Sequence, residues 1–242
     1  MTRILTIILV FIGTVVIGQN IQIDTFRLEK SERFKDIQSK KMNFPIIITG
    51  NNQIDSLINT DLKNRFTDNQ YPMYSLDSTL IKWAADQIVF LDFQVTYNQN
   101  GILSINISAE GCGAYCTGWT HYFNYSTLNG NWLDISDVIK NPIEFKERVN
   151  KDKEEQFAEQ KKYLREMLNE TDSGLDKSTY DWAIESYKNC ERKTDLESFS
   201  IFPNRLEIIE DCNLPNAIKN LKPSIELKYN FTEIGEVLKI KN

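Results

Sequence analysis

The sequence predicts an α+β fold, with a mainly antiparallel sheet built around a central meander and helices packed on one face. Segments that alternate apolar and polar residues follow one another in the middle of the chain, and segments with helical periodicity flank them. The 242 residues contain no internal repeat and no Pro/Gly/Ser-rich linker. We therefore expect a single extracytoplasmic domain over 19–242, with two interlocked subdomains, 19–100 and 101–242, as the alternative.

The N-terminal segment 1–18 has the pattern of a cleaved secretory signal peptide. Arg3 provides a positive start, and residues 4–17 are almost wholly apolar. This apolar run is shorter than the ~20 residues that a membrane-spanning helix needs. We therefore expect cleavage after Gly18, no membrane span in the mature protein, and a secreted or periplasmic location.

Two strands and two helices are expected ahead of the meander. Residues 21–28 and 44–49 are rich in β-branched side chains, which favours strands. A capping box of Asn52 and Asp55 indicates the start of a helix, because the apolar residues after it fall on one helical stripe. A second, short helix is expected over 77–85.

The meander is expected to consist of three strands. Residues 89–97 alternate apolar and polar side chains, the Asn-Gln-Asn-Gly sequence of 98–101 indicates a turn, and 103–109 alternate back. A third strand is expected over 118–126. The residues expected to share a face are Val89, Leu91, Phe93, Val95 and Tyr97 in the first strand and Trp119, His121, Phe123 and Tyr125 in the third.

Helices and then strands are expected in the last hundred residues. Residues 142–169 form a charged segment with an apolar line at helical spacing. Another helix is expected over 177–187, with Ser178 and Asp181 as its capping box. A short helix should follow Thr232. The expected strands are 199–202, 206–209 and 225–231.

The four cysteines indicate two disulfides. An even number of cysteines in an exported chain is typical of disulfide bonding, and four cysteines allow three pairings. We favour Cys112 with Cys116, which closes a loop dense in turn-forming residues. The remaining pair, Cys190 with Cys212, would then join the end of a helix to the end of a strand.

Composition and motifs exclude several classes of function. The chain has 28 basic and 34 acidic side chains, a net charge of −6 without a basic patch, so we expect no nucleic-acid partner. His121 is the only histidine, which excludes sites that need two. No G-x-S-x-G, P-loop or dinucleotide motif is present. We expect no cofactor and no metal.

Several segments, in order, resemble a known extracellular domain family. It occurs in lysozyme-sensing anti-sigma factors of the RsiV type and beside the catalytic domain of peptidoglycan deacetylases of the PdaC type. The resemblance covers about 44–238, with a gap in the helical middle. The matching segments are Phe44-Pro-Ile-Ile-Ile-Thr-Gly50, Val95-Thr-Tyr-Asn98, Tyr122-Phe-Asn-Tyr125, Leu133-Asp-Ile-Ser-Asp137, Phe202-Pro-Asn-Arg-Leu206 and Tyr229-Asn-Phe231.

The resemblance implies a bacterial envelope module whose relatives bind or sense cell-wall enzymes or wall polymers. Members of the family carry Gly-Gly-Ala-His in the loop after the central hairpin, whereas this chain has Gly111-Cys-Gly-Ala-Tyr115. No anti-sigma segment or deacetylase sequence is recognised either. We therefore expect neither relative's full activity.

The candidate binding surface is the loop 110–120 with the start of the strand after it. Large amphipathic side chains around glycines and a disulfide suit a recognition surface. The candidate residues are Glu110, Tyr115, Trp119, His121 and Tyr122. The expected partner is an envelope protein, such as a lysozyme-like enzyme, or a peptidoglycan-type glycan. The competing interpretation is that Trp119, His121 and Tyr122 are ordinary packing residues of the sheet.

Two other functions remain as alternatives. In the first, the protein is an exported thiol-dependent enzyme that uses Cys112 or Cys116 as the nucleophile and His121 to lower the thiol pKa. This alternative requires a free thiol in the mature protein. In the second, the protein is a structural component of an envelope assembly.

Overall fold

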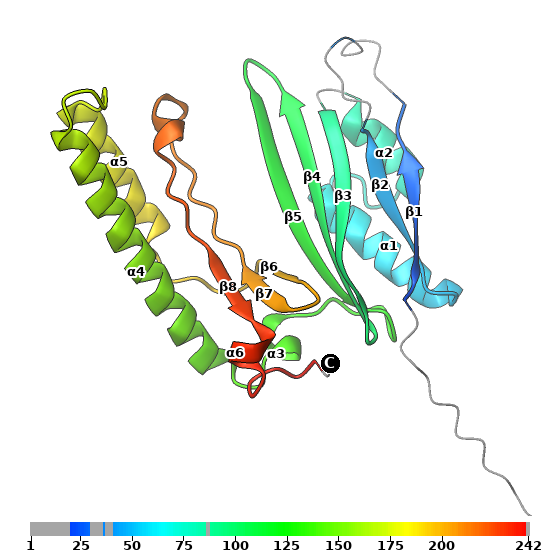
Figure 1. Cartoon of the computed structure of the whole chain (residues 1–242). Helices are drawn as coiled ribbons and strands as arrows, with labels where there is room; N and C mark the ends of the chain where they lie inside the picture. The colour runs from blue at the N-terminus through cyan, green and yellow to red at the C-terminus, as the bar shows by residue number, and fades with distance from the viewer. Residues whose placement is uncertain (1–19, 30–35, 37–40, 86–87, 241–242) are drawn as a thin grey trace, which may run out of the picture.

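A computed structural model describes residues 20–29, 36, 41–85 and 88–240 of the chain (Figure 1). The signal peptide expected at 1–18 lies outside these residues. The strands are β1 (Gln22–Arg27), β2 (Asn43–Ile48), β3 (Ile88–Gln99), β4 (Ile102–Cys112), β5 (Cys116–Ser126), β6 (Phe199–Ile201), β7 (Arg205–Ile208) and β8 (Leu227–Asn230). The helices are α1 (Asn52–Phe66), α2 (Leu76–Ala84), α3 (Ile135–Val138), α4 (Pro142–Asn169), α5 (Lys177–Cys190), the 3-10 helix η1 (Asn216–Leu221) and α6 (Phe231–Ile234).

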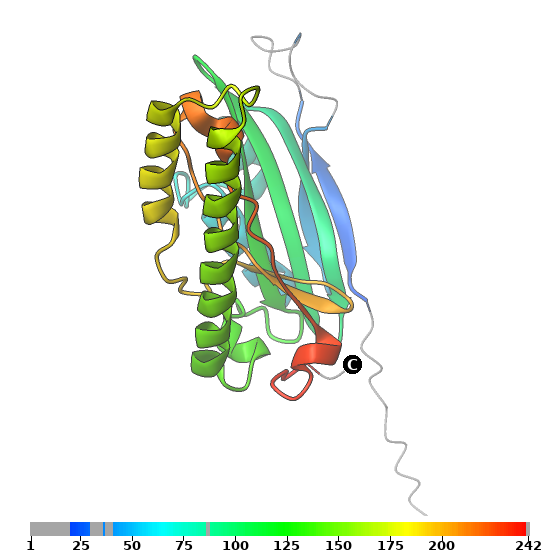
Figure 2. The same cartoon turned by 60° about the vertical axis from the view of Figure 1, so that its left-hand side comes forward.

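The predicted fold class is confirmed, because helices combine with three antiparallel sheets of order β1-β2, β3-β4-β5 and β6-β7-β8. The meander β3–β5 forms the central sheet, with α1 and α2 on one side (Figure 1). The sheet β6–β8 lies on its other side, and α4 and α5 run side by side beyond it (Figure 2). A parallel bridge between Met42 and Leu91 links β2 to the edge of β3.

The turn between β3 and β4 has the backbone that its sequence predicts. Asn100 and Gly101 both have positive φ angles, 55° and 75°. Two successive left-handed residues are characteristic of a type I′ hairpin turn, for which Asn-Gly is the favoured pair. This turn fixes the register of the hairpin at its closed end.

The expected face assignment of Tyr97 in β3 is wrong. Leu91, Phe93 and Val95 lie on the α1 side as expected, but Tyr97 belongs to the hydrophobic cluster on the opposite side. The cause is a register shift between Val95 and Tyr97, which leaves Thr96 as an extra residue in β3. A β-bulge of this kind breaks the period of two, so side chains beyond it change faces.

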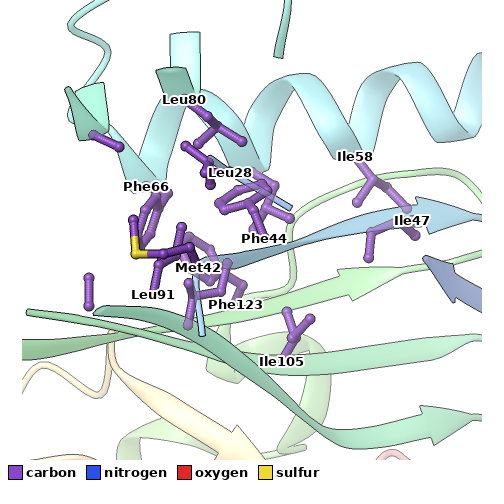
Figure 3. Close-up of a cluster of buried hydrophobic side chains, with 14 of the residues drawn as sticks. Leu28, Met42, Phe44, Ile47, Ile58, Phe66, Leu80, Leu91, Ile105 and Phe123 are labelled. Atoms are coloured by element: carbon purple, nitrogen blue, oxygen red, sulfur yellow. The ribbon is translucent and has the colours of Figure 1, made fainter. Parts of the chain in front are cut away.

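A hydrophobic core fills the space between α1, α2 and the central sheet (Figure 3). Phe66 contacts several other rings there, with its ring centroid 5.3 Å from that of Phe44 and 4.9 Å from that of Trp83. Burial of each large apolar side chain contributes about 1.5–3 kcal/mol. The other core residues labelled in Figure 3 are Leu28, Met42, Ile47, Ile58, Leu80, Leu91, Ile105 and Phe123.

The opposite face of the central sheet is polar where it meets β6. Thr96 Oγ1 lies 3.0 Å from the hydroxyls of both Ser104 and Ser200. Nearby, Asn124 Nδ2 donates to the carbonyl oxygen of Phe199 at 2.9 Å. Burying polar groups is much less costly when they have hydrogen-bond partners, so these bonds favour this docking of the second sheet. The contact with β6 covers the half of the central sheet near the β3–β4 turn. The half near the β4–β5 turn takes no part in this contact.

Two of the expected helix caps are replaced by neighbouring residues. The N-cap of α1 is Asn51, whose side chain accepts from the backbone of Gln53 and Ile54, while Asp55 accepts from Thr49. The N-cap of α5 lies two residues before Ser178, the first residue of the predicted capping box. It is Asp176, which accepts from Thr179. In both cases an Asn or Asp directly before the helix accepts hydrogen bonds from backbone N–H groups of the first turn, which have no partner within the helix.

The remaining elements differ from prediction mainly in length. Helix α4 matches the expected span 142–169, whereas β8 covers only part of the expected strand 225–231. The 3-10 helix η1 was not expected. None of the helices within the described residues combines the length and hydrophobicity that a membrane crossing requires.

Candidate functional site

The most distinctive surface of the molecule is the outer edge of β5. Near the end of the strand the chain folds back on this edge, where Leu133 N donates to Asn124 O and Ser126 N donates to Asn131 O. Both bonds involve even-numbered residues of β5. Because the register with β4 has no shift along β5, the backbone groups of Gly118, Thr120 and Tyr122 also point away from β4.

Two adjoining cavities lie along this edge, with volumes of about 650 and 630 Å³. They share Thr120 and Tyr122 of β5 and, on the far side, Ile209 and Asp211. We call this combined space the edge cleft. It lies between the outer half of β5 and the segment 209–222, which leaves β7 and runs into η1.

Two long-range links hold the far wall of the edge cleft in place. A disulfide joins Cys190, at the end of α5, to Cys212. Beside it, Lys153 of α4 donates to the Glu210 carboxylate at 2.7 Å and to the Arg192 carbonyl at 2.7 Å. The Lys153 side chain is only 3% exposed. The wall is therefore tied to α4 and α5 by a covalent bond and a buried ion pair.

Two of the predicted binding residues, Glu110 and Tyr122, face the edge cleft together. Neither side chain has a hydrogen-bond partner among the described residues. Burial raises the pKa of the Tyr122 hydroxyl, and the negative charges of Asp211 and Glu207 add to this shift. The phenol therefore stays protonated at neutral pH and presents both a donor and an acceptor to the cleft.

Trp119 and His121 extend from the other face of β5, towards α1 and α2. The Trp119 ring packs at 6.3 Å against Trp83, and it crosses Gly111 so closely that a Cβ there would lie 3.3 Å from it. The His121 ring packs edge-on at 5.7 Å against Phe66. Both side chains also line part of the edge cleft. Each residue therefore packs in the core and also contributes to the cleft surface.

Tyr115 stands apart from the other predicted residues. It occupies the tip of the β4–β5 hairpin, is 77% exposed and does not line the edge cleft. A disulfide between Cys112 and Cys116 closes this tip. Tyr115 therefore lies outside the edge cleft, at the hairpin tip.

The geometry does not support a thiol–imidazole pair. All four cysteines are in disulfides, with the pairing favoured from the sequence. Cys116 and His121 are an odd number of residues apart in β5, so their side chains lie on opposite faces of the sheet. Glu110 approaches the Cys112 and Cys116 sulfurs, but sulfurs in a disulfide are not the thiolates that bind metal ions.

Sequence reasoning missed the far wall of the edge cleft and its lower end, which is the end away from the β4–β5 hairpin tip. Asp211, with its ion-pair partner Lys222, belongs to the far wall. At the lower end the Arg65 guanidinium lies 4.2 Å from the centre of the Trp132 ring. Arg65, Asp211 and Lys222 are far from 110–122 in sequence, and no motif links them or Trp132 to that segment. Only Cys212, a predicted disulfide partner, pointed to this segment.

We expect His121 to make the protein less stable in mild acid. Burial lowers the pKa of the imidazole, and Asp68 opposes this shift only in part. The unfolded chain therefore binds the proton more readily, so stability is complete above about pH 6.5 and falls as the pH drops through that value. The variant His121→Phe keeps the ring contact with Phe66 and should lose less stability between about pH 7.5 and pH 5 in urea denaturation. An unchanged loss would contradict this assignment.

Comparison with known proteins identifies the fold and no more. No protein-family model matches the chain, and no curated protein matches it. A DUF3298 family member from Bacteroides fragilis superposes with a TM-score of 0.58 at 13% identity, covering 92% of this chain and 96% of that chain. A DUF3298 family protein from Pseudomonas aeruginosa gives 0.50 at 14% identity, covering 91% and 95%.

The protein therefore has the fold of DUF3298 structures, a domain of unknown function. Identities this low carry the architecture but not a site or an activity. The finer resemblance to the domains of anti-sigma factors and deacetylases stays a prediction.

Proposed function

We propose that this chain is a non-catalytic, exported envelope module that binds a protein or a cell-wall glycan in the edge cleft. The observation that carries the proposal is the lining of the cleft. Tyr122 and Glu110 offer polar groups there that have no hydrogen-bond partner within the described part of the chain, next to the backbone edge of Thr120. Concave sites with a few convergent polar groups and amphipathic rings are typical of recognition surfaces.

Two observations support export. The two disulfides fit an oxidising compartment, and the N-terminal sequence has the pattern of a signal peptide. The resemblance to envelope domains agrees with this location. Mass analysis of the mature N-terminus would test it, because the proposal requires a chain that begins after Gly18.

The thiol-enzyme alternative makes a different prediction about the cysteines. It needs at least one free thiol, whereas the proposed binding module keeps both disulfides. Thiol counting on denatured, unreduced protein separates the two functions directly. The assembly alternative requires a stable complex with other envelope proteins, which native mass spectrometry would detect.

The binding proposal is tested with lysozyme and with soluble peptidoglycan fragments as probes. We expect at least one of them to raise the melting temperature, because a ligand that binds only the folded state stabilises it. Tyr122→Ala should remove that shift, since it deletes the central ring of the cleft. Tyr115→Ala tests separately whether the hairpin tip takes part.

The matched control is Tyr163→Ala, because Tyr163 is an exposed tyrosine of α4 that does not line the edge cleft. It should leave every shift unchanged. A shift that survives Tyr122→Ala would place binding elsewhere. Absence of any shift with both probes would contradict binding of a lysozyme or a wall glycan.

A further inference from the structure

We propose that the edge cleft binds an extended, basic peptide segment of a partner protein, which adds to the central sheet as a further strand beside β5. The inference rests on the proposed function, and it specifies the ligand class and the mode of recognition. Addition of a strand to a free sheet edge is an established way in which proteins recognise peptides.

The first argument comes from the backbone of β5. Gly118, Thr120 and Tyr122 direct their N–H and C=O groups out of the sheet, and no backbone group of the described residues bonds to them there. The chain at 131–133 already occupies the lower part of the same edge, up to Asn124. An added peptide would pair with β5 next to residues 131–133 and extend from there towards the hairpin tip.

The disulfide at the hairpin tip supports this assignment of directions independently. Cys112 and Cys116 face each other with a Cα–Cα distance of 4.0 Å. Close spacing is typical of antiparallel pairs that do not exchange hydrogen bonds with each other. Cys116 is even-numbered, like Thr120, so both ends of β5 indicate that the even-numbered residues point their backbone groups outward.

The edge lacks the features by which proteins usually protect exposed strands. From Thr117 to Phe123 there is no proline and no lysine, and the register shows no bulge. Natural edge strands are commonly blocked by such features or covered by another element, because an open edge pairs with other chains. Here the space beside the edge is the edge cleft, with its two cavities of about 650 and 630 Å³.

The two faces of the cleft specify an alternating peptide. Residues of the added strand beside Thr120 and Tyr122 would face the polar side, where Glu110 lies. Residues beside Trp119 and His121 would face the ring side, next to Trp132. Since side chains of a strand alternate between faces, we expect polar and apolar residues at alternate positions of the ligand.

The charges of the lining indicate a basic ligand. Asp211 is paired with Lys222, and Arg65 is paired with Asp61; Glu210 pairs with the buried Lys153. The lining carboxylates without an ion-pair partner among the described residues are Glu110, Asp134 and Glu197, against Lys219 as the one such cation. This excess of negative charge favours lysine or arginine at the polar positions and disfavours a second copy of the same acidic edge.

The test uses a synthetic, fluorescently labelled peptide of about nine residues that alternates lysine and valine. We expect it to bind the full protein, and we expect Thr120→Pro to weaken binding by at least ~10-fold. Proline removes an N–H that points outward, so the pairing with β4 is kept. The matched control is Thr120→Val, which loses the hydroxyl contact with Ser108 but keeps the N–H; it should change affinity by less than ~2-fold.

Two further measurements keep the test independent of how well the proline variant folds. The first is a peptide that is N-methylated at the alternate positions whose N–H groups would face β5. It lacks the donors for the outward carbonyl oxygens of β5, so it should not bind the unaltered protein. Hydrogen exchange should show new protection at the amides of Thr120 and Tyr122 when the peptide binds. The amides of Trp119 and His121 already face β4 and should change little.

The outcomes separate this proposal from the proposed function. Equal binding of the N-methylated peptide, or of a peptide with glutamate in place of lysine, would overturn strand addition by a basic segment. No peptide binding, together with a Tyr122-dependent shift from peptidoglycan fragments, would overturn it but keep the binding function. A dimer in native mass spectrometry that Thr120→Pro dissolves would assign the edge to a second copy instead.

Discussion

Replacing Glu210 with leucine is expected to destabilise the protein by roughly 3–5 kcal/mol. The Lys153 side chain is 3% exposed and that of Glu210 is 17% exposed, so their ion pair is largely withdrawn from water. Without the carboxylate, the Arg192 carbonyl is the one hydrogen-bond partner that the Lys153 ammonium keeps among the residues described by the structure. An uncompensated buried charge is far more costly than the pair itself is stabilising. Urea denaturation measures the loss.

The control is a double-mutant cycle. Lys153→Met combined with Glu210→Leu removes both charges and should recover most of the lost stability, because apolar side chains can replace a buried pair at little cost. Glu210→Gln keeps a hydrogen-bond acceptor and should fall between the two. If the double variant were as unstable as Glu210→Leu, the loss would not come from the unpaired charge.

The second large effect concerns the disulfide between Cys190 and Cys212. It closes a sequence separation of 22 residues, for which the chain-entropy estimate is about 3 kcal/mol of stabilisation. We therefore expect Cys190→Ser with Cys212→Ser to lower the melting temperature by ~10 °C without abolishing the fold. The large hydrophobic cores do not depend on this bond. Calorimetry checks both parts of the expectation.

The second disulfide provides the comparison. Cys112 and Cys116 are only 4 residues apart, so Cys112→Ser with Cys116→Ser should cost less stability and mainly loosen the hairpin tip. A larger loss from this pair would contradict the entropy argument. Because Cys212 belongs to the wall of the edge cleft, removal of its disulfide should also weaken peptide binding, whereas Tyr163→Ala should not.

The elements of the fold could be predicted where a local pattern carried enough information. The turn at Asn100 and Gly101, the alternating rings of β5 and the long helix α4 are all visible in the sequence. The face of Tyr97 could not be predicted, because nothing in the sequence marks the bulge at Thr96. The bulge allows the Thr96 hydroxyl to meet Ser200, a contact across a hundred residues.

The candidate site was only half predictable for the same reason. Glu110 and Tyr122 lie in one hairpin, so their grouping follows from local sequence. The opposite wall, with Asp211, reaches them only because α4 and α5 hold the segment 209–222 in place. Packing between distant segments depends on shape and pairing that no short pattern records.

The sequence by itself determined the antiparallel α+β class, the two disulfide pairs and which residues of β5 share a face. These properties follow from backbone periodicity and from short-range turn chemistry. Only the tertiary structure decided that no backbone group of the described residues pairs with the edge of β5 from Gly118 to Tyr122, and that the segment 209–222 stands opposite it. An edge strand stays open when no other segment of the chain pairs with it. The positions of the other segments depend on the burial of apolar side chains and the pairing of polar groups throughout the molecule.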